Sequence, residues 1–390
     1  MTAAADPQTA PVGTAAPRAD RAAANGPGFA DGLRASWKIW LGSRVVVTVL
    51  SLMSARVLGS YAGRDVPGFV QLWDRWDVGL FTKVARDGYL SPKYTDRTEV
   101  DFPGLPLAMR LVHVVIPNWV VAGLVISLVA GLATSAALWS LAAGDAPSDR
   151  WIGARAVLAM VLFPYAVFLF AGYSEGIFLA GASCAWLAAR QQRWWLAGLL
   201  ACLSTSSRIL GIAVVAGLAV QYLIVERRLR WSAAWLALPL LPIVGFLTYM
   251  RVRTGVWDSY SRAMKAGWGR STDWPWKGLQ VTWDNAVNGG QSSPFQVFWW
   301  AEIAAVFVGL WLTVVLLRER RWGEAVLVFG FVAIMSSSSY WASGVRAILV
   351  AFPLYLWLAR HRRTGYVYAL LAAPVMAAFV VAFTQGSWVD

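Results

Sequence analysis

Long apolar stretches, separated by short connections rich in Arg, recur along the chain from residue 37 almost to its end. A helix needs roughly 20 apolar residues to cross a bilayer, and about 17 is near the lower limit. The composition agrees with such crossings, because 58% of the residues are hydrophobic and 14% are charged, whereas a soluble domain is about half apolar and about a quarter charged. The pattern predicts an all-α polytopic membrane protein and excludes a soluble enzyme, a disordered chain and a collagen-like fibre.

By this measure about eleven membrane spans are expected, several of them short. They cover residues 37–60, 118–142, 152–171, 174–190, 194–207, 209–225, 231–250, 296–317, 323–339, 347–360 and 364–384. The spans 194–207 and 347–360 fall below the length limit and could be tilted or re-entrant. Residues 1–35, rich in Ala, Pro, Gly and Thr, are predicted to form a disordered tail. Residues 36–390 are expected to form a single membrane domain.

Arg clusters in very short connections predict the orientation of the spans. These clusters occupy residues 190–193, 227–230, 318–321 and 360–363. The positive-inside rule places them in the cytoplasm, so the net charge of +13 does not indicate a nucleic-acid partner. The N-terminus is then cytoplasmic, residues 104–116 lie along the external interface, and the long loops 61–103 and 251–295 are external. We expect any chemistry on that external face, where the polar residues gather.

The first external loop contains a predicted amphipathic helix. Its apolar residues recur at helical spacing: Trp73, Trp76, Leu80 and Val84. This spacing is typical of a helix that lies on the outer leaflet. Gly88 is expected to cap its C-terminus.

Asp74 and Asp77 fall three residues apart near the start of this predicted helix. Acidic side chains there interact favourably with the helix dipole and repel each other. They could be ordinary first-turn acids. One of them could instead be a general base, which accepts a proton from an acceptor hydroxyl at the membrane surface. Their spacing does not choose between the two.

Short motifs at the loops and helix ends follow one another in a definite order. The first loop carries Arg75-Trp76-Asp77, Phe81, Gly88-Tyr89 and Phe102-Pro103-Gly104-Leu105-Pro106. Later segments carry Phe163-Pro164, Tyr173-Ser174-Glu175, Ser207-Arg208 with Gly211, and Arg346 with Phe352-Pro353-Leu354. Together they span residues 40–360 and resemble the PIG-V family, the second mannosyltransferase of GPI-anchor synthesis, although Ile209-Leu210 replaces a polar pair. The Trp268-Gly269-Arg270 stretch, followed by Trp274-Pro275-Trp276, resembles the large-loop motif of bacterial relatives.

The resemblance implies a GT-C type glycosyltransferase that takes mannose from a polyprenyl phosphate on the external face, with inversion. It implies Asp77, rather than Asp74, as the general base. Arg208, Arg346 and Arg270 are expected to bind the donor phosphate, because guanidinium groups suit bidentate phosphate contacts. The expected substrate contacts are Asp74, Trp76, Tyr173, Glu175 and Trp268.

Simpler roles stay open for several of these residues. Arg208 and Arg346 could be interfacial side chains that extend their charge toward water. Glu175 could pair with one of these Arg residues, or be an ordinary acid at a helix start. The Trp residues of the large loop could anchor the protein in the membrane or pack against it.

Arg far outnumbers Lys, and Ala, Gly and Trp are abundant, a composition associated with GC-rich bacteria. A bacterium has no GPI anchor, so we expect a lipid, glycan or protein of the cell envelope as acceptor, in the plasma membrane, with membrane lipids as further partners. The donor sugar could differ from mannose. No cofactor is expected, although loop acids could hold a divalent ion. The alternatives are a lipid or sugar transporter or flippase, disfavoured because no internal repeat is evident, and a non-catalytic scaffold.

Overall fold

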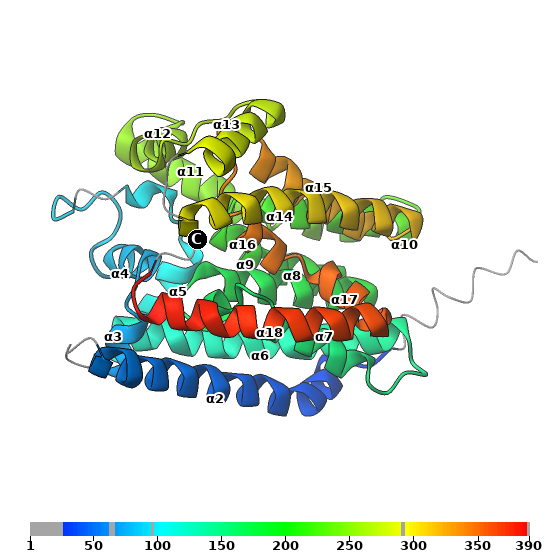
Figure 1. Cartoon of the computed structure of the whole chain (residues 1–390). Coiled ribbons are helices and arrows are strands. Elements are labelled where there is room, and N and C mark those ends of the chain that lie inside the picture. The colour runs from blue at the N-terminus through cyan, green and yellow to red at the C-terminus, as the bar shows by residue number, and fades with distance from the viewer. Residues whose placement is uncertain (1–25, 62–66, 95–96, 290–292, 388–390) are drawn as a thin grey trace, which may run out of the picture.

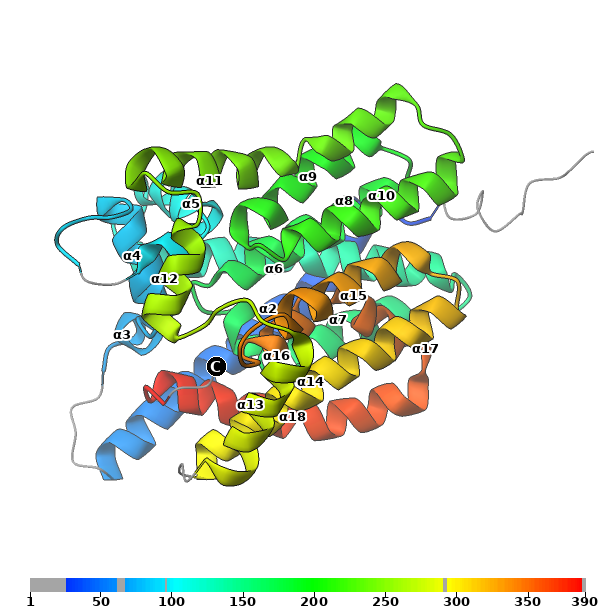
Figure 2. The same ribbon diagram turned by 90° about the horizontal axis from the view of Figure 1, so that it is seen from above.

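The computed structural model describes residues 26–61, 67–94, 97–289 and 293–387. These residues form an all-helical protein, in which the long helices α6 (Trp119–Asp145) and α18 (Arg362–Thr384) pack against α2 (Phe29–Tyr61), and the long helix α14 (Ser293–Arg318) lies farther from α2 (Figures 1 and 2). Within the described residues the β pairing consists of one isolated bridge between Thr272 and Ser338. The all-α prediction is confirmed.

Shorter helices complete the bundle. In chain order they are α3 (Phe69–Trp73), α4 (Asp77–Asp87), η1 (Thr98–Val100), α5 (Gly104–His113), α7 (Ile152–Val161), η2 (Ala166–Leu169), α8 (Ser174–Arg190), α9 (Trp194–Ser207), α10 (Gly211–Glu226), η3 (Trp231–Ala237), α11 (Leu240–Thr254), α12 (Ser259–Trp268), α13 (Pro275–Asn288), α15 (Trp322–Ser336), α16 (Gly344–Leu349) and α17 (Phe352–Arg360). Helix α8 is almost entirely buried and forms the centre of the core.

Several helix boundaries match the predicted spans, and α8 and α9 match theirs at both ends. Five helices among the described residues are long and apolar enough to cross a membrane. They are Phe29–Leu58, Trp119–Asp145, Trp231–Thr254, Gln296–Arg318 and Arg362–Thr384. Three further apolar helices, α7, α10 and α15, are shorter. The chain is therefore an integral membrane protein, while the count of eleven spans stays a prediction.

Prolines divide three of the predicted spans. The expected spans 152–171, 231–250 and 347–360 each contain two helical segments. Pro164 follows α7, Pro239 precedes α11, and Pro353 lies in the first turn of α17. Proline lacks a backbone N–H and disfavours helical geometry in the residue before it, so a continuous helix ends near these positions.

The amphipathic helix expected in the first loop is present as α4, but it begins at Asp77, and Trp73 belongs to the separate short helix α3. Trp76, which lies between them, has φ 54° and ψ −125°, a conformation that a side chain larger than Gly rarely adopts. Asp74 therefore follows the end of α3, and Asp77 is the first residue of α4. Gly88 ends α4 with φ 80°, as predicted.

The N-terminal boundary also differs from the expectation. Helix α2 begins at Phe29, so residues 29–35, predicted to belong to the tail, are helical. Residues 1–25 of the predicted tail lie outside the described residues. Asp31 in the first turn of α2 accepts a hydrogen bond from the backbone N–H of Gly28 at 3.0 Å, which favours a helix start there.

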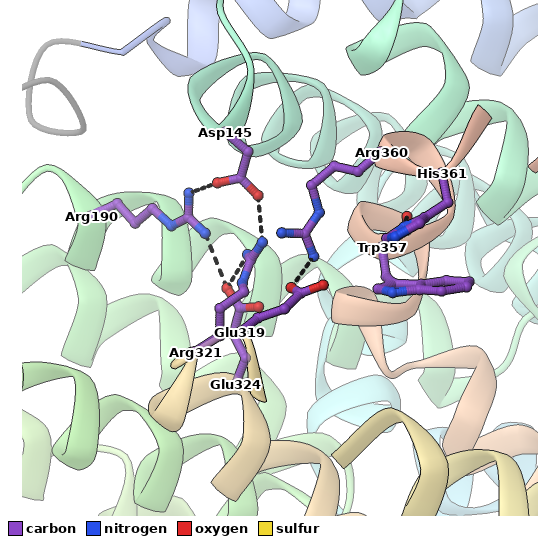
Figure 3. Close-up of polar contacts among 8 residues, drawn as sticks. All are labelled: Asp145, Arg190, Glu319, Arg321, Glu324, Trp357, Arg360 and His361. Carbon is purple, nitrogen blue, oxygen red and sulfur yellow. Dashed lines mark hydrogen bonds and ion pairs between the residues drawn. The ribbon is translucent and has the colours of Figure 1, made fainter. Parts of the chain in front are cut away.

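The two ends of the bundle carry different segments. Helices α3, α4 and α12 lie at one end, where α18 also finishes (Figure 1, left). The Arg-rich connections meet at the opposite end, where Arg321 bonds to Asp145 at 2.6 Å and to Glu324 at 2.5 Å, and Arg190 bonds to both acids (Figure 3). The fold therefore gathers the Arg clusters at one end and the long loops at the other.

Candidate active site

A cavity of about 790 Å³ lies at the α4 end of the bundle. Its walls come from α4, the segment before α5, α12, α14, α15, α16 and the connection between α9 and α10. Five of the predicted site residues, from four separate motifs, line this one cavity: Asp77, Arg208, Trp268, Arg270 and Arg346. The four motifs are far apart in the chain, so tertiary packing brings them together.

Glu175 holds two of these Arg residues from behind the cavity wall. Its side chain is fully buried at the start of α8. Its Oε1 accepts hydrogen bonds from Nε and Nη2 of Arg346, both at 2.6 Å, and another from Arg208. The carboxylate offsets the repulsion between the two cations and fixes both at the wall. The structure thus agrees with the pairing role considered for Glu175, which is not among the cavity-lining residues.

Asp77 faces the same guanidinium from the other side. Nη1 of Arg346 lies 3.3 Å from Oδ2 of Asp77, whose side chain is 33% exposed. The backbone N–H of Asp77 donates to the Tyr173 hydroxyl at 3.2 Å. The Arg346 guanidinium lies 5.1 Å and 4.9 Å from the ring centroids of Tyr173 and Phe168, which contact each other, as in cation–π contacts. Tyr173 is buried beneath the wall, where it orients both charged residues.

Arg270 belongs to a wall built from two chain segments. Its Nε donates to Oγ of Ser338 at 3.2 Å, and its Nη2 donates to the Ala342 carbonyl at 3.3 Å. The Tyr340 hydroxyl donates to the Trp268 carbonyl at 2.5 Å. These contacts join the connection between α12 and α13 to the connection between α15 and α16, so the cation has a defined position.

Asp101 and Tyr260 are among the cavity residues that were absent from the sequence-based set. Asp101, which is 7% exposed, and Tyr260 both line the cavity. Burial raises the pKa of the Tyr260 phenol, while the nearby Arg270 and Arg208 act to lower it, so the hydroxyl stays protonated and can donate a hydrogen bond. The available signal for Asp101 is its place directly before the Phe102-Pro103-Gly104-Leu105-Pro106 motif.

Asp74 and Trp76 are not among the residues that line the cavity. Asp74 is exposed at the end of α3, and Trp76 is also exposed. Their roles as substrate contacts stay predictions. In the described part of the chain, no three His, Cys, Asp or Glu side chains come together as a metal site.

Comparison with known proteins gives a fold but no sequence family. No protein-family model matches the chain, and no curated protein sequence matches it, so the resemblance to PIG-V stays a prediction. The structure is similar to ArnT from Cupriavidus metallidurans bound to undecaprenyl phosphate, with a TM-score of 0.51 and 14% identity over 90% of this chain and 78% of that chain. For ArnT in the apo state the TM-score is 0.46, with 13% identity over 89% and 77%. The likeness to the undecaprenyl phosphate complex shows that the chain has the all-helical membrane fold of ArnT.

Proposed function

We propose that this protein transfers a sugar from a polyprenyl phosphate to an acceptor hydroxyl in the cavity beside Asp77. The observation that carries the proposal is that Asp77 and three Arg residues, from four separate segments, line the same cavity. A carboxylate can accept the acceptor's proton, and guanidinium groups can stabilise a departing phosphate. ArnT, which has the same fold, was crystallised with undecaprenyl phosphate, and this supports a polyprenyl phosphate as the sugar carrier.

In the proposed reaction, Asp77 removes the proton of the acceptor hydroxyl. The acceptor oxygen attacks the anomeric carbon on the face opposite the phosphate, and a new carbon–oxygen bond forms as the bond to the phosphate oxygen breaks. The electron pair of the broken bond stays on the lipid phosphate, whose charge changes from −1 to about −2. A β-linked donor would give an α-linked product.

The charges of the cavity suit this change. Arg208, Arg270 and Arg346 line it together with Asp77 and Asp101, so cations outnumber acids at the wall. Cations that are held before the reaction stabilise the negative charge that develops on the phosphate without having to reorganise. A leaving group that gains charge therefore benefits more than the bound donor, as catalysis requires.

We further propose that the sugar is mannose and that the acceptor is a lipid, glycan or protein of the cell envelope, reached from the external face of a bacterial plasma membrane. The motif resemblance supports the sugar, and the composition supports the acceptor. The Arg-rich connections at the other end of the bundle support the orientation, because positive loops favour the cytoplasm.

The test measures sugar transfer by purified protein in lipid, with radiolabelled polyprenyl-phosphate mannose as donor and envelope lipid extract as acceptor. Wild type is compared with Asp77→Asn and with Asp284→Asn, which changes an exposed carboxylate on α13 away from the cavity. We expect transfer by wild type and by Asp284→Asn, and none by Asp77→Asn. Equal transfer by all three would remove Asp77 from the reaction. Failure of wild type with mannose and with other polyprenyl-phosphate sugars would overturn the proposed function.

A further inference from the structure

Arg346 contacts two carboxylates with unequal strength. Its bonds to Glu175 are both 2.6 Å, whereas its contact with Asp77 is 3.3 Å. Charge-assisted N–H···O bonds are strongest near 2.7–2.9 Å and weaken as they lengthen. Arg346 is therefore anchored on Glu175 and bonded more weakly to Asp77.

The surroundings decide which partner can move. The Arg346 side chain is 7% exposed and lies against the neighbouring rings of Phe168 and Tyr173, and Glu175 is fully buried. The Asp77 side chain is 33% exposed, and its backbone N–H is held by the Tyr173 hydroxyl. Rotation of the Asp77 side chain can thus open the contact while the guanidinium stays in place.

A carboxylate that is bonded to a guanidinium is a poor proton acceptor, because the cation stabilises its charged form. A phosphate is a strong competitor for the same nitrogen, since its oxygens match guanidinium geometry. We propose that Arg346 is shared between Asp77 and the phosphate of the donor lipid, so that donor binding releases the Asp77 carboxylate to act as the base.

This inference rests on the proposed function and adds an order to it. The donor must bind first, because its phosphate frees the group that activates the acceptor. Before the donor arrives, Asp77 stays bonded to Arg346, and an acceptor hydroxyl finds a weaker base. The sharing of Arg346 thus links proton removal by Asp77 to the presence of a donor sugar that can be transferred.

Other charged or polar groups of the cavity also act on a phosphate. Arg208, Arg270, Asp101 and Tyr260 line the same space, and Arg208 shares Glu175 with Arg346. Removing the negative charge of Asp77 could therefore strengthen phosphate binding through general electrostatics. A double-mutant cycle separates that effect from one that passes through Arg346.

The experiment measures the affinity of the protein, in lipid nanodiscs, for a polyprenyl methyl phosphodiester. This probe has one negative charge and no sugar to transfer. We expect Asp77→Asn to bind it about tenfold more tightly than wild type, because the competing carboxylate is gone. In an Arg346→Gln background, the same Asp77→Asn change should alter the affinity by less than about threefold.

Arg270 provides the matched control. It bonds to Ser338 and Ala342, so the tenfold gain should persist when Asp77→Asn is made in an Arg270→Gln background. Arg346→Lys, which keeps a cation for Glu175 but has no Nη1, replaces Arg346→Gln if the latter does not fold.

Each contrary outcome has a distinct meaning. No gain in Asp77→Asn, or an equal gain in the Arg346 background, would overturn the sharing of Arg346 and leave the proposed function standing. A wild-type protein that does not bind the phosphodiester would overturn the proposed function as well, since a donor phosphate would then have no site.

Discussion

Two clusters of Arg and acidic side chains lie at opposite ends of the bundle and are built alike. In the cavity cluster, Glu175 bonds to Arg208 and Arg346. In the far cluster, Glu324 bonds to Arg190 at 3.0 Å and to Arg321 at 2.5 Å (Figure 3). In each, a buried carboxylate near the N-terminus of a helix holds two guanidinium groups.

The clusters differ in the space beside them. In the far cluster, Asp145 bonds to the same two Arg residues as Glu324, so two acids balance two cations. Arg190 borders a cavity of about 20 Å³, and the bonds join the ends of α6, α8 and α15. The cavity cluster has a third cation, Arg270, at a wall that encloses about 790 Å³. Arg–carboxylate bonding by itself therefore marks a clamp, whereas Arg residues that border a large cavity together with a partly exposed carboxylate, Asp77, mark a candidate site.

The largest effect should come from Asp77→Asn, which removes the proposed base at the cavity and has no counterpart in the far cluster. Loss of a general base typically costs about 10²–10⁴-fold in rate, and the amide cannot accept the proton. The rate is measured at saturating donor in the transfer assay. Unchanged thermal stability of the variant would assign the loss to chemistry, while a rate within about threefold of wild type would contradict the role of a base.

Arg321→Gln should break the far cluster and leave the chemistry intact. It leaves Asp145 and Glu324 with Arg190 as their shared cation, and removing one partner of a buried ion pair costs about 3–5 kcal/mol. Chemical unfolding in micelles should show this loss, with a transfer rate per folded molecule close to that of wild type. A rate that falls while stability is unchanged would show that the far cluster also acts in function.

Arg208→Gln changes the cavity cluster and should have the opposite effect, a large loss of transfer rate with a small loss of stability. Removal of one group that stabilises a developing anion typically lowers kcat by about 10²–10³-fold. Glu175 keeps its two bonds to Arg346, so the free energy of unfolding should fall less than in Arg321→Gln. Steady-state kinetics and unfolding of the same preparation test both parts, and a stability loss without a rate loss would make Arg208 a second clamp.

Arg360→Gln should have the smallest effect and provides a baseline. Arg360 bonds to Glu319 at 2.7 Å, with side chains 23% and 27% exposed (Figure 3). Partly exposed ion pairs contribute about 0.2–1 kcal/mol, so unfolding should change by no more than this and transfer should not change. A loss comparable to that of Arg321→Gln would show that the whole far end acts as one network.

The sequence alone determined the class of the protein and many of its helix limits. The apolar lengths and the Arg-rich connections predict a polytopic helical membrane protein, and α8 and α9 begin and end where the pattern says. These features are local, because the hydrophobicity of each segment and the residues at its ends decide whether it can form a buried helix. The short motifs likewise identified Asp77, Arg208, Arg270 and Arg346 as candidate site residues before any geometry was available.

Tertiary structure alone decided how those residues relate to one another. Asp77 and Arg346 are 269 positions apart in the chain, and no local pattern links them. The break at Trp76, the burial of Glu175 and the inclusion of Asp101 in the cavity depend on how distant helices pack. Packing of that kind decides which carboxylate faces a substrate and which one holds the cations. Burial and distance, rather than residue type, control how strongly each charged group interacts with its neighbours.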